Sequence, residues 1–347
     1  MRIVCTNVDF GDPTPYPDVR LNEWQSVGDA QVLYLKPQDY TARRLAKLVR
    51  STRTQTVYIS SLFDQASLGL AAIHCVAGLA GKVIIAPRGE LLEGPLTTGS
   101  SSKKILAIKF LGVLGLAKKV HWHATSEVEA AGFQKQFPGI PPDRITVAAN
   151  LPDARREAPQ HTKAKEPGKL AVVFCSRIST KKRLELLLGA MAKTAQGVSL
   201  DVIGQADEPA FLTQCQEVLA KSDVAARVRF LGPLPHMEIQ KRLPGYDLFV
   251  LPTMGENYGH AIVEALGAGV RVVITDTTPW SSVAQAGAGH IVEPTEEALA
   301  RAIDLYAAMP EDQHSKARSA ARSYFETTVL GNVDLSGYEQ MFGLLAP

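Results

Sequence analysis

The sequence contains few cysteines, and their spacing fits no metal site or disulfide framework. Four are present, they are scattered along the chain, and no Cys-x-x-Cys pair occurs. Reduced thiols inside a cytosolic protein are the simplest interpretation. The four are Cys5, Cys75, Cys175 and Cys215.

Long apolar runs are also missing. The longest apolar segment, Ile105–Ala117, is interrupted by Lys109 and is too short to span a bilayer. The start of the chain lacks the basic residues and the long apolar stretch of a signal peptide, so we expect a cytoplasmic protein. A net charge of +2 over 347 residues gives no reason to expect a nucleic-acid partner.

Short apolar runs alternate with longer runs of helical period, which predicts βα units around parallel sheets. The predicted strands are Arg2–Thr6, Gln31–Leu35, Thr56–Ser60, Lys82–Ala86, Lys119–Ala124, Ile145–Ala148, Leu170–Cys175, Ser199–Ile203, Arg227–Leu231, Asp247–Leu251, Arg271–Thr275 and Gly289–Glu293. The predicted helices are Ala42–Arg50, Ser67–Gly78, Ser102–Ala117, Ser126–Phe137, Arg183–Thr194, Pro209–Lys221, Met237–Leu243, His260–Gly267, Glu296–Ala308 and Asp312–Phe325. Ser126 is expected to cap its helix.

The length and a break in this pattern predict two domains. Residues 151–169 are polar and contain proline, which is typical of an exposed linker. We therefore expect an N-terminal Rossmann-like domain at 1–150 and a C-terminal one at 170–326. The remaining segment, 327–347, is expected to pack back toward the first domain.

The first loop of the C-terminal domain is basic. Arg177, Lys181 and Lys182 lie between a predicted strand and a predicted helix. Guanidinium and ammonium groups at such a turn suit a diphosphate, since Arg offers a planar fork and Lys a mobile charge. A solvated basic loop without a ligand is the alternative for this segment by itself.

A second loop, residues 252–260, follows the strand that ends at Leu251. Gly259 allows close backbone approach to a ligand, and the helix start behind it offers free N–H groups to an anion. Glu256 lies on the loop, and Glu264 lies about one turn into the helix. Carboxylates accept hydrogen bonds from hydroxyls. A ligand with hydroxyls at both ends and negative charge in the middle fits this set, and a nucleoside-diphosphate sugar has that layout.

The segment ENYGHAIVEALGAGVRVVITD resembles the E-x7-E signature of retaining glycosyltransferases of family four. SRISTKKRLELLLGA resembles the Arg-x4-Lys donor loop of that family, and LDVIGQADEP and VRFLGPLP resemble its intervening segments. The match runs over about residues 170–293. It implies the GT-B fold, an α/β architecture in which two Rossmann-like doubly wound parallel-sheet domains face a central cleft.

The resemblance also implies roles for single residues. Arg177 and Lys182 contact the diphosphate, Glu264 holds the ribose, and Glu256 holds the transferred sugar. The other donor-binding residues that it implies are Asn257, Tyr258, Gly259, His260, Ala261, Gly204 and Leu234. The family uses no bound metal, and the sequence contains no Asp-x-Asp pair, so we expect neither a metal nor another cofactor.

The N-terminal half matches less closely. HATSEVEA and APRGELLEGPL resemble segments of family members that build bacterial surface polysaccharides. Many members carry a glycine pair in the first βα loop, where this chain has only Gly11, and many carry a histidine where this chain has Arg88. Arg88 completes the predicted catalytic set of Glu256, Arg177 and Lys182; it can steady an anion but cannot act as a base. Glu90 and His123 are expected to be structural.

Two features remain open. Trp280 follows the strand after the signature helix and either stacks on a ligand or closes a hydrophobic corner. Basic residues cluster on two predicted helices of the first half, which either rest on an anionic membrane surface or are ordinary solvated helices. They are Arg43, Arg44, Lys47, Arg50, Arg53, Lys103, Lys104, Lys109, Lys118 and Lys119.

The predicted function is retaining transfer of a hexose from a nucleotide-sugar donor to a sugar or lipid-linked sugar acceptor, in bacterial polysaccharide or glycolipid synthesis. Two alternatives stay open: a nucleotide-sugar 2-epimerase of GT-B fold, and a subunit that binds a nucleotide sugar without turnover. The enzyme is expected in the cytoplasm, with peripheral contact at the inner membrane face.

Overall fold

The computed structural model describes residues 1–9, 13–92, 101–152, 164–220 and 223–343. It divides the chain into two compact units, Met1–Ala149 with Asp334–Pro347, and Asn150–Val333. Most of the predicted linker, residues 153–163, lies outside the described residues, as does Gly11.

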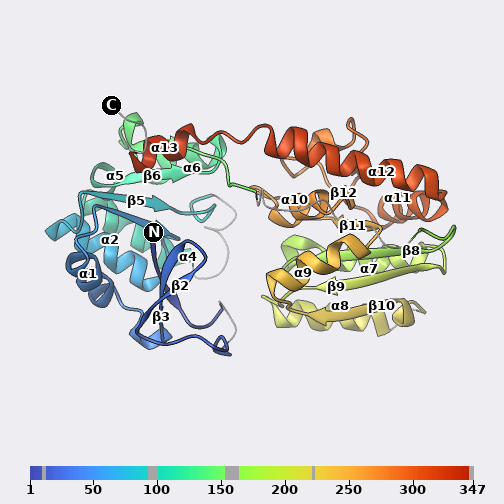
Figure 1. Cartoon of the computed structure of the whole chain (residues 1–347), viewed down its shortest axis with the longest axis horizontal. Helices are drawn as coiled ribbons and strands as arrows, with labels where there is room; N and C mark the ends of the chain where they lie inside the picture. Colours follow the sequence, from blue (N-terminus) through green and yellow to red (C-terminus); the bar gives the residue numbers. More distant parts are fainter. Residues whose placement is uncertain (10–12, 93–100, 153–163, 221–222, 344–347) are drawn as a thin grey trace. The chain divides into compact units, whose positions relative to one another are not determined.

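The strands of the first unit lie in two hydrogen-bonded groups (Figure 1). One has the order β1-β3-β2, with β1 (Arg2–Thr6), β3 (Ala30–Leu35) and β2 (Trp24–Val27). The other has the order β4-β5-β6-β7, with β4 (Thr56–Ser60), β5 (Lys82–Ala86), β6 (His121–Ala124) and β7 (Ile145–Val147). The pairing is parallel except between β2 and β3. The sequence did not predict β2, because its four residues are half exposed and lack an apolar run.

Helices cover these strands. They are α1 (Ala42–Ser51), α2 (Gln65–Ala77), α4 (Ser101–Val113), α5 (Leu116–Lys119) and α6 (Glu127–Gln136). The predicted cap is confirmed, since the Ser126 hydroxyl accepts a hydrogen bond from the backbone of Glu129. The single helix predicted over 102–117 is wrong: α4 and α5 are separated at Gly115, whose φ of 76° ends the helical path.

The end of the chain returns to the first unit. Helix α13 (Ser336–Phe342) lies beside β7, and the Tyr338 hydroxyl donates to the carbonyl of Ala149 over 2.9 Å. Lys82 donates from Nζ to the carbonyl of Met341, which is buried. The contacts begin later than residue 327, because Phe325–Leu330 still continues the last helix of the second unit.

The second unit is built on one parallel sheet with the order β10-β9-β8-β11-β12-β13 (Figure 1). Its strands are β8 (Leu170–Cys175), β9 (Val198–Ile203), β10 (Val228–Gly232), β11 (Leu248–Leu251), β12 (Arg271–Ile274) and β13 (Gly289–Ile291). Its helices are α7 (Leu184–Lys193), α8 (Pro209–Ala220), α9 (His236–Arg242), α10 (His260–Gly267), α11 (Glu296–Ala308) and α12 (Glu311–Tyr324).

Burial explains why these strands were predicted well. The residues of β11 and β12 are all buried, and both are short continuous apolar runs apart from Arg271. Parallel strands are covered on both faces, so their sequences lack the alternation of half-exposed strands. Here α7 packs against α8 and α11, while α10 packs against α12.

The expectations about the cysteines and about membrane-spanning segments can be compared with the structure. Cys75, Cys175 and Cys215 are free and buried, and Cys5 is free and partly exposed. Within the described residues, every helix is too short or too polar to cross a bilayer.

Candidate functional site

The loops after β8 and β11 leave the sheet side by side. Val172 of β8 pairs with Leu248 of β11 in parallel register, so the carboxyl ends of both strands reach the same edge. The backbone N–H of Met254 donates to the carbonyl of Lys181 over 2.8 Å and ties the two loops together. Ligands of open α/β sheets bind at this edge.

Lys182 and Glu256 join these loops through a buried ion pair. Nζ of Lys182 donates to Oε1 of Glu256, and the two side chains are only 10% and 13% exposed. Charges removed from water remain stable when they are paired and hydrogen-bonded. An ammonium has three donors and a carboxylate two acceptor oxygens, so each partner keeps capacity for a ligand.

Arg177 lies on the first of the two loops and is more exposed. Its Nη1 donates to Oδ2 of Asp207 over 2.7 Å, and 68% of its side chain is exposed. Burial lowers the pKa of Lys181, and the positive charges of Lys182 and Arg177 lower it further against the opposing effect of Glu256. The loop is therefore a cluster of interacting cations with one buried acid beside it.

The start of α10 depends on Gly259. Its φ of 80° lies in the left-handed region that favours glycine. A methyl group there would lie 3.0 Å from Cδ1 of Ile262 and 3.5 Å from Cγ of Glu256. Glycine thus brings the backbone close to Glu256 at the N-terminal end of α10, where the helix dipole favours negative charge.

Trp280 fixes the backbone just before α10. Its indole N–H donates to the carbonyl of Tyr258. The Tyr258 ring centroid lies 5.4 Å from that of Trp280 and 4.8 Å from that of His260. Of the two roles considered for Trp280, the structure provides the contacts for the hydrophobic corner.

Threonines hold the same loop from the neighbouring strand exit. The carbonyl of Thr253 accepts hydrogen bonds from the hydroxyls of Thr275 at 2.7 Å and Thr277 at 2.9 Å. The backbone N–H of Glu256 donates to the carbonyl of Thr277 over 3.3 Å. The sequence analysis did not assign these threonines to the site, and their only signal was their place at or just after the end of a predicted strand.

Glu264 faces the end of β8. Burial raises the pKa of Cys175, the last residue of β8, to about 12, and the negative charge of Glu264 contributes to that shift. Oε1 of Glu264 also lies 3.7 Å from Nδ1 of His236, at the start of α9. Arg177 follows Cys175 by two residues, so the structure gathers four of the predicted charged residues around the exits of β8 and β11, namely Arg177, Lys182, Glu256 and Glu264. His236 and Asp207 were not predicted.

The remaining predicted donor residues border this region. The N–H of Gly204 donates to the carbonyl of Gly232 over 3.0 Å, which joins the exits of β9 and β10. Leu234 and Ala261 pack partly buried against the core of the second unit, and Asn257 is half-buried. Their contacts with a donor stay predictions.

Arg88 belongs to the first unit and ends a chain of hydrogen bonds. Its Nη2 donates to the Tyr58 hydroxyl over 2.8 Å, which lies 2.7 Å from Nδ1 of His123. Nε2 of His123 lies 2.8 Å from the carbonyl of Ala148. A carbonyl only accepts, so Nε2 carries the proton and Nδ1 accepts from Tyr58. The Tyr58 hydroxyl and the ring N–H of His123 therefore each have an acceptor, and Arg88 donates to the Tyr58 oxygen at the other end of this series of hydrogen bonds.

Two carboxylates brace the backbone that carries Arg88. Glu90 accepts hydrogen bonds from the Ser61 hydroxyl at 2.7 Å and from the backbone of Leu62 at 2.6 Å. The buried Glu129 accepts from the backbone of Gly89 at 2.5 Å. The structural role expected of Glu90 agrees with these contacts, whereas Glu129 was missed.

We expect His123→Gln to make the protein less sensitive to acid. Burial lowers the pKa of His123 below 6.5, its ordinary value. Because the folded ring binds a proton less tightly than the unfolded one, its stabilising contribution is complete above pH 6.5 and is lost as the pH falls through the folded pKa. Urea denaturation between pH 7.5 and 5 should show a wild-type loss of up to about 1.4 kcal/mol per pH unit from this proton.

Tyr58→Phe is the matched control, since it removes the hydroxyl but keeps the imidazole. We expect it to lower the free energy of unfolding by about 1–3 kcal/mol at every pH while the slope remains. Equal slopes in wild type and His123→Gln would contradict the assignment of a neutral, buried His123.

The sequence is similar to several known proteins. Residues 155–323 match the family model of glycosyl transferases group 1. The phosphatidyl-myo-inositol mannosyltransferase of Mycobacterium tuberculosis is 25% identical over 273 residues, which cover 73% of this chain and 70% of that protein. The lipopolysaccharide core biosynthesis mannosyltransferase LpsB of Rhizobium meliloti is 32% identical over 132 residues, 37% of this chain and 36% of that one.

Solved structures are similar in fold. HepE of Anabaena, in complex with UDP and glucose, superposes with a TM-score of 0.67 at 18% identity, over 91% of this chain and 85% of that one. WaaG, a glycosyltransferase involved in lipopolysaccharide biosynthesis, does so with a TM-score of 0.64 at 15% identity over the full length of both. These likenesses confirm the predicted GT-B fold with its two Rossmann-like domains.

Proposed function

Since the chain is related to the group 1 glycosyl transferases, we propose that it moves a hexose from a nucleoside-diphosphate sugar to an acceptor hydroxyl with retention of the anomeric configuration. The observation that carries the proposal is the buried pair of Lys182 and Glu256, set between the β8 and β11 exits and beside the α10 start. The pair supports the proposal because a sugar joined to a diphosphate calls for a cation at the phosphates and a carboxylate at the sugar hydroxyls.

The proposed roles follow from the chemistry of each group. Lys182 and Arg177 neutralise the diphosphate, together with the positive end of the α10 helix dipole. Glu256 accepts hydrogen bonds from hydroxyls of the transferred hexose, and Glu264 accepts from the ribose diol. Because side-chain cations already carry out the neutralisation, we propose that transfer needs no bound metal ion.

Loss of the diphosphate leaves an oxocarbenium-like sugar, and negative charge develops on the departing phosphate. Lys182 is held in place by Glu256, so it stabilises that charge without reorganising. Glu256 itself is engaged by Lys182, which favours a positioning role over nucleophilic attack. We therefore propose front-face attack by the acceptor, assisted by the departing phosphate.

The acceptor belongs to the same proposal. Two of the related proteins are named for phosphatidyl-myo-inositol and for the lipopolysaccharide core. We propose a sugar or lipid-linked acceptor of bacterial surface glycolipid or polysaccharide synthesis, used at the cytoplasmic face of the inner membrane. Arg88, fixed by Tyr58, is the proposed contact of the first unit with an anionic group of substrate.

A ligand screen tests the donor site. We expect one of the UDP-, GDP- or ADP-sugars to raise the melting temperature, since about 2.7 kcal/mol is gained at a ligand concentration of 100 Kd. Arg177→Ala should reduce that shift, while Arg229→Ala, which breaks an ion pair with Asp201 elsewhere in the same unit, should not. A shift that is unchanged in Arg177→Ala would contradict the assigned phosphate contact.

The reaction is tested with the donor that the screen identifies. We expect release of nucleoside diphosphate that depends on an added acceptor, and a product whose anomeric proton coupling matches that of the donor. An epimer formed from donor alone would favour the epimerase alternative. Tight donor binding without any turnover would favour the alternative of a subunit that binds a nucleotide sugar but does not catalyse a reaction.

A further inference from the structure

The last helix of the chain covers a small hydrophobic core of the first unit. Met341 of α13 is 1% exposed and packs against Ile84 of β5 and against Ala148, the residue after β7. Gly337 permits this close packing, since a methyl group there would lie 3.0 Å from both Cβ of Ala148 and the carbonyl oxygen of Val147. Helix α13 is therefore packed tightly on the sheet formed by β4, β5, β6 and β7.

Two aromatic residues of α13 enclose the hydrogen-bonded pair of Tyr58 and His123. The ring centroid of Tyr338 lies 5.4 Å from that of His123, edge to face. The ring centroid of Phe342 lies 5.9 Å from that of Tyr58. With these rings beside it, the His123 side chain is fully buried.

This enclosure decides which way the hydrogen bond between Tyr58 and His123 runs. Burial lowers the pKa of His123 and raises the pKa of Tyr58 to about 12, so the ring is neutral and the hydroxyl keeps its proton. With its proton on Nε2, the ring accepts at Nδ1, and the Tyr58 proton is committed to it. The lone pairs of the Tyr58 oxygen are then directed to Nη2 of Arg88.

Arg88 itself has an unfavourable backbone conformation. Its φ of 54° lies in the left-handed region, which residues with a side chain rarely adopt. The buried Glu129 binds the neighbouring N–H of Gly89 and so helps to hold the chain in this shape. Strained residues of this kind cluster at ligand sites, where surrounding contacts fix them.

We propose that α13 and His123 position Arg88 for the acceptor. The helix keeps His123 out of water, His123 orients the Tyr58 hydroxyl, and that hydroxyl directs the guanidinium. Tyr338 and Phe342 are positioning residues, because they act only through Arg88. The inference thus rests on the proposed contact of Arg88 with an anionic group of substrate, and it makes the end of the chain a determinant of acceptor binding.

Nuclear magnetic resonance of the full chain, with histidine and arginine labelled by a nitrogen isotope, tests the first step without substrate. Tyr338→Ala admits water to the ring of His123, so the midpoint of its titration should rise toward 6.5, the ordinary histidine pKa. Tyr338→Phe keeps the covering ring and should titrate like the wild type. The other groups that face the ring are the same in both variants: Arg88 lowers its pKa, Glu129 raises it, and Tyr58 is neutral.

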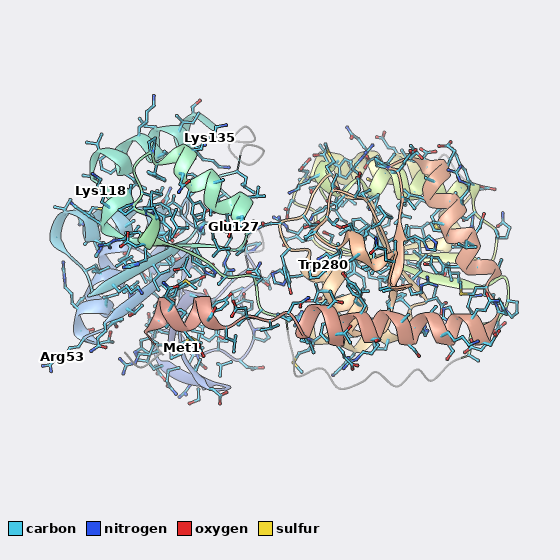
Figure 2. All side chains as sticks on the ribbon, turned by 90° about the horizontal axis from the view of Figure 1, so that it is seen from above. Met1, Arg53, Lys118, Glu127, Lys135 and Trp280 are labelled. Carbon is cyan, nitrogen blue, oxygen red and sulfur yellow. The ribbon has the colours of Figure 1, made fainter. Side chains whose placement is uncertain are left out.

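Phe137→Ala is the matched control, since it also removes a buried aromatic ring from the first unit. Phe137 packs on Trp122, with ring centroids 5.1 Å apart. Trp122 and His123 are consecutive residues of β6, so their side chains leave opposite faces of the strand. Figure 2 shows Lys135, at the same helix end as Phe137, well apart from the short red helix α13. This variant should lower the melting temperature without changing the titration of His123.

The signal of the Arg88 side chain tests the second step. A protonated His123 donates from Nδ1 to the Tyr58 oxygen and competes there with Arg88. The Nε–H signal of Arg88 should therefore follow the titration of His123 with the same midpoint, and Tyr338→Ala should raise both midpoints together. In Tyr58→Phe the ring should still titrate, but the Arg88 signal should no longer follow it.

Inorganic sulfate, which keeps its charge over this pH range, is the probe for the anionic group of an acceptor. At pH 7.5 we expect added sulfate to shift the Arg88 signal. Tyr338→Ala and Phe342→Ala should each weaken this binding roughly fivefold, because a less ordered guanidinium must be fixed when the anion binds. Phe342 is 39% exposed, so its truncation is the milder change and decides the question if Tyr338→Ala does not fold.

Each contrary result overturns the proposal. An unchanged midpoint in folded Tyr338→Ala would show that α13 does not protect His123, and an equal rise in Phe137→Ala would show general loosening instead. An Arg88 signal that ignores His123 in the wild type, or sulfate binding that Phe342→Ala leaves intact, would refute the positioning of Arg88. None of these measurements needs a donor. If they hold while no sugar transfer is found, the proposed function fails alone; if they fail in an active transferase, only the role of α13 is lost.

Discussion

Replacing Glu256 with alanine is expected to lower the rate of sugar transfer by roughly a thousandfold, because the contact that we propose between Glu256 and the reacting sugar is lost. The same change leaves Lys182 without its buried partner. An uncompensated buried charge costs about 3–5 kcal/mol of stability. Activity and the free energy of unfolding must therefore be measured on the same preparations.

Two variants separate the contributions. Glu256→Gln keeps the shape and a hydrogen-bond acceptor but removes the negative charge, so it should bind donor and still transfer slowly. Lys182→Met removes the cation that we propose neutralises the departing phosphate, and it should lower kcat more than it changes KM. In the variant that carries both substitutions the two losses of activity should not add, since each single substitution already disrupts the same pair of Lys182 and Glu256.

Glu238→Ala provides the control for the loss of a carboxylate. Glu238 pairs with Arg242 over 2.7 Å on α9, and both side chains are well exposed. Exposed pairs contribute little to stability, so neither transfer nor stability should change. Unaltered transfer by folded Glu256→Ala would refute the role proposed for Glu256, whatever the control shows.

Local sequence patterns predicted most of the second unit. The β8 and β11 runs are apolar throughout, and the bounds of β8 and α10 match their predictions. The two strands are recognisable because burial on both faces makes them apolar throughout, and the helix is recognisable because its start is marked in the sequence. In the first unit, β2 and the break at Gly115 were missed, because β2 depends on its partner β3 and a glycine within an apolar helical run has no unique interpretation.

The sequence predicted which residues belong to the candidate site, but it did not predict the ion pairs and hydrogen bonds among them. The sequence placed Lys182 and Glu256 on loops after two predicted strands, but it could not show that these strands are neighbours or that the two side chains form a pair. Likewise, Asp207 and His236 lie far from Arg177 and Glu264 along the chain, and only the fold brings each beside its partner. Contacts of this kind depend on the relative positions of side chains after packing, which no local pattern encodes.

Gly204→Ala is expected to destabilise the second unit strongly. Gly204 has a φ of 147°, and a methyl group there would lie 1.9 Å from the carbonyl oxygen of Ser176. That carbonyl belongs to the turn between β8 and Arg177, so the clash is with backbone and cannot be relieved by a side-chain rotation. The turn is also held by the N–H of Ser176 on the carbonyl of Ile203 and by that of Ile178 on the carbonyl of Gln205.

We expect a loss of about 3–5 kcal/mol in the free energy of unfolding, because either the turn moves or its hydrogen bonds break. If the chain folds with the turn displaced, Arg177 moves with it, and donor affinity falls although the side chain of Arg177 itself is unchanged. Urea denaturation measures the first effect, and titration with the nucleotide sugar measures the second.

Two other glycines make the comparison specific. Gly232 receives the hydrogen bond from Gly204 and has a φ of 70°, but a methyl group there meets nothing within 4 Å, so Gly232→Ala should cost only the backbone strain of about 1–2 kcal/mol. Gly245 has open space as well and no positive φ, so Gly245→Ala should be close to neutral. The loss of stability should therefore be largest for Gly204→Ala, which suffers both a backbone contact and backbone strain. It should be smaller for Gly232→Ala, which suffers strain alone, and smallest for Gly245→Ala, which suffers neither. If Gly204→Ala were as stable as Gly232→Ala, the close approach of the β9 exit to the Arg177 turn would be disproved, and with it the reason for a glycine at this position.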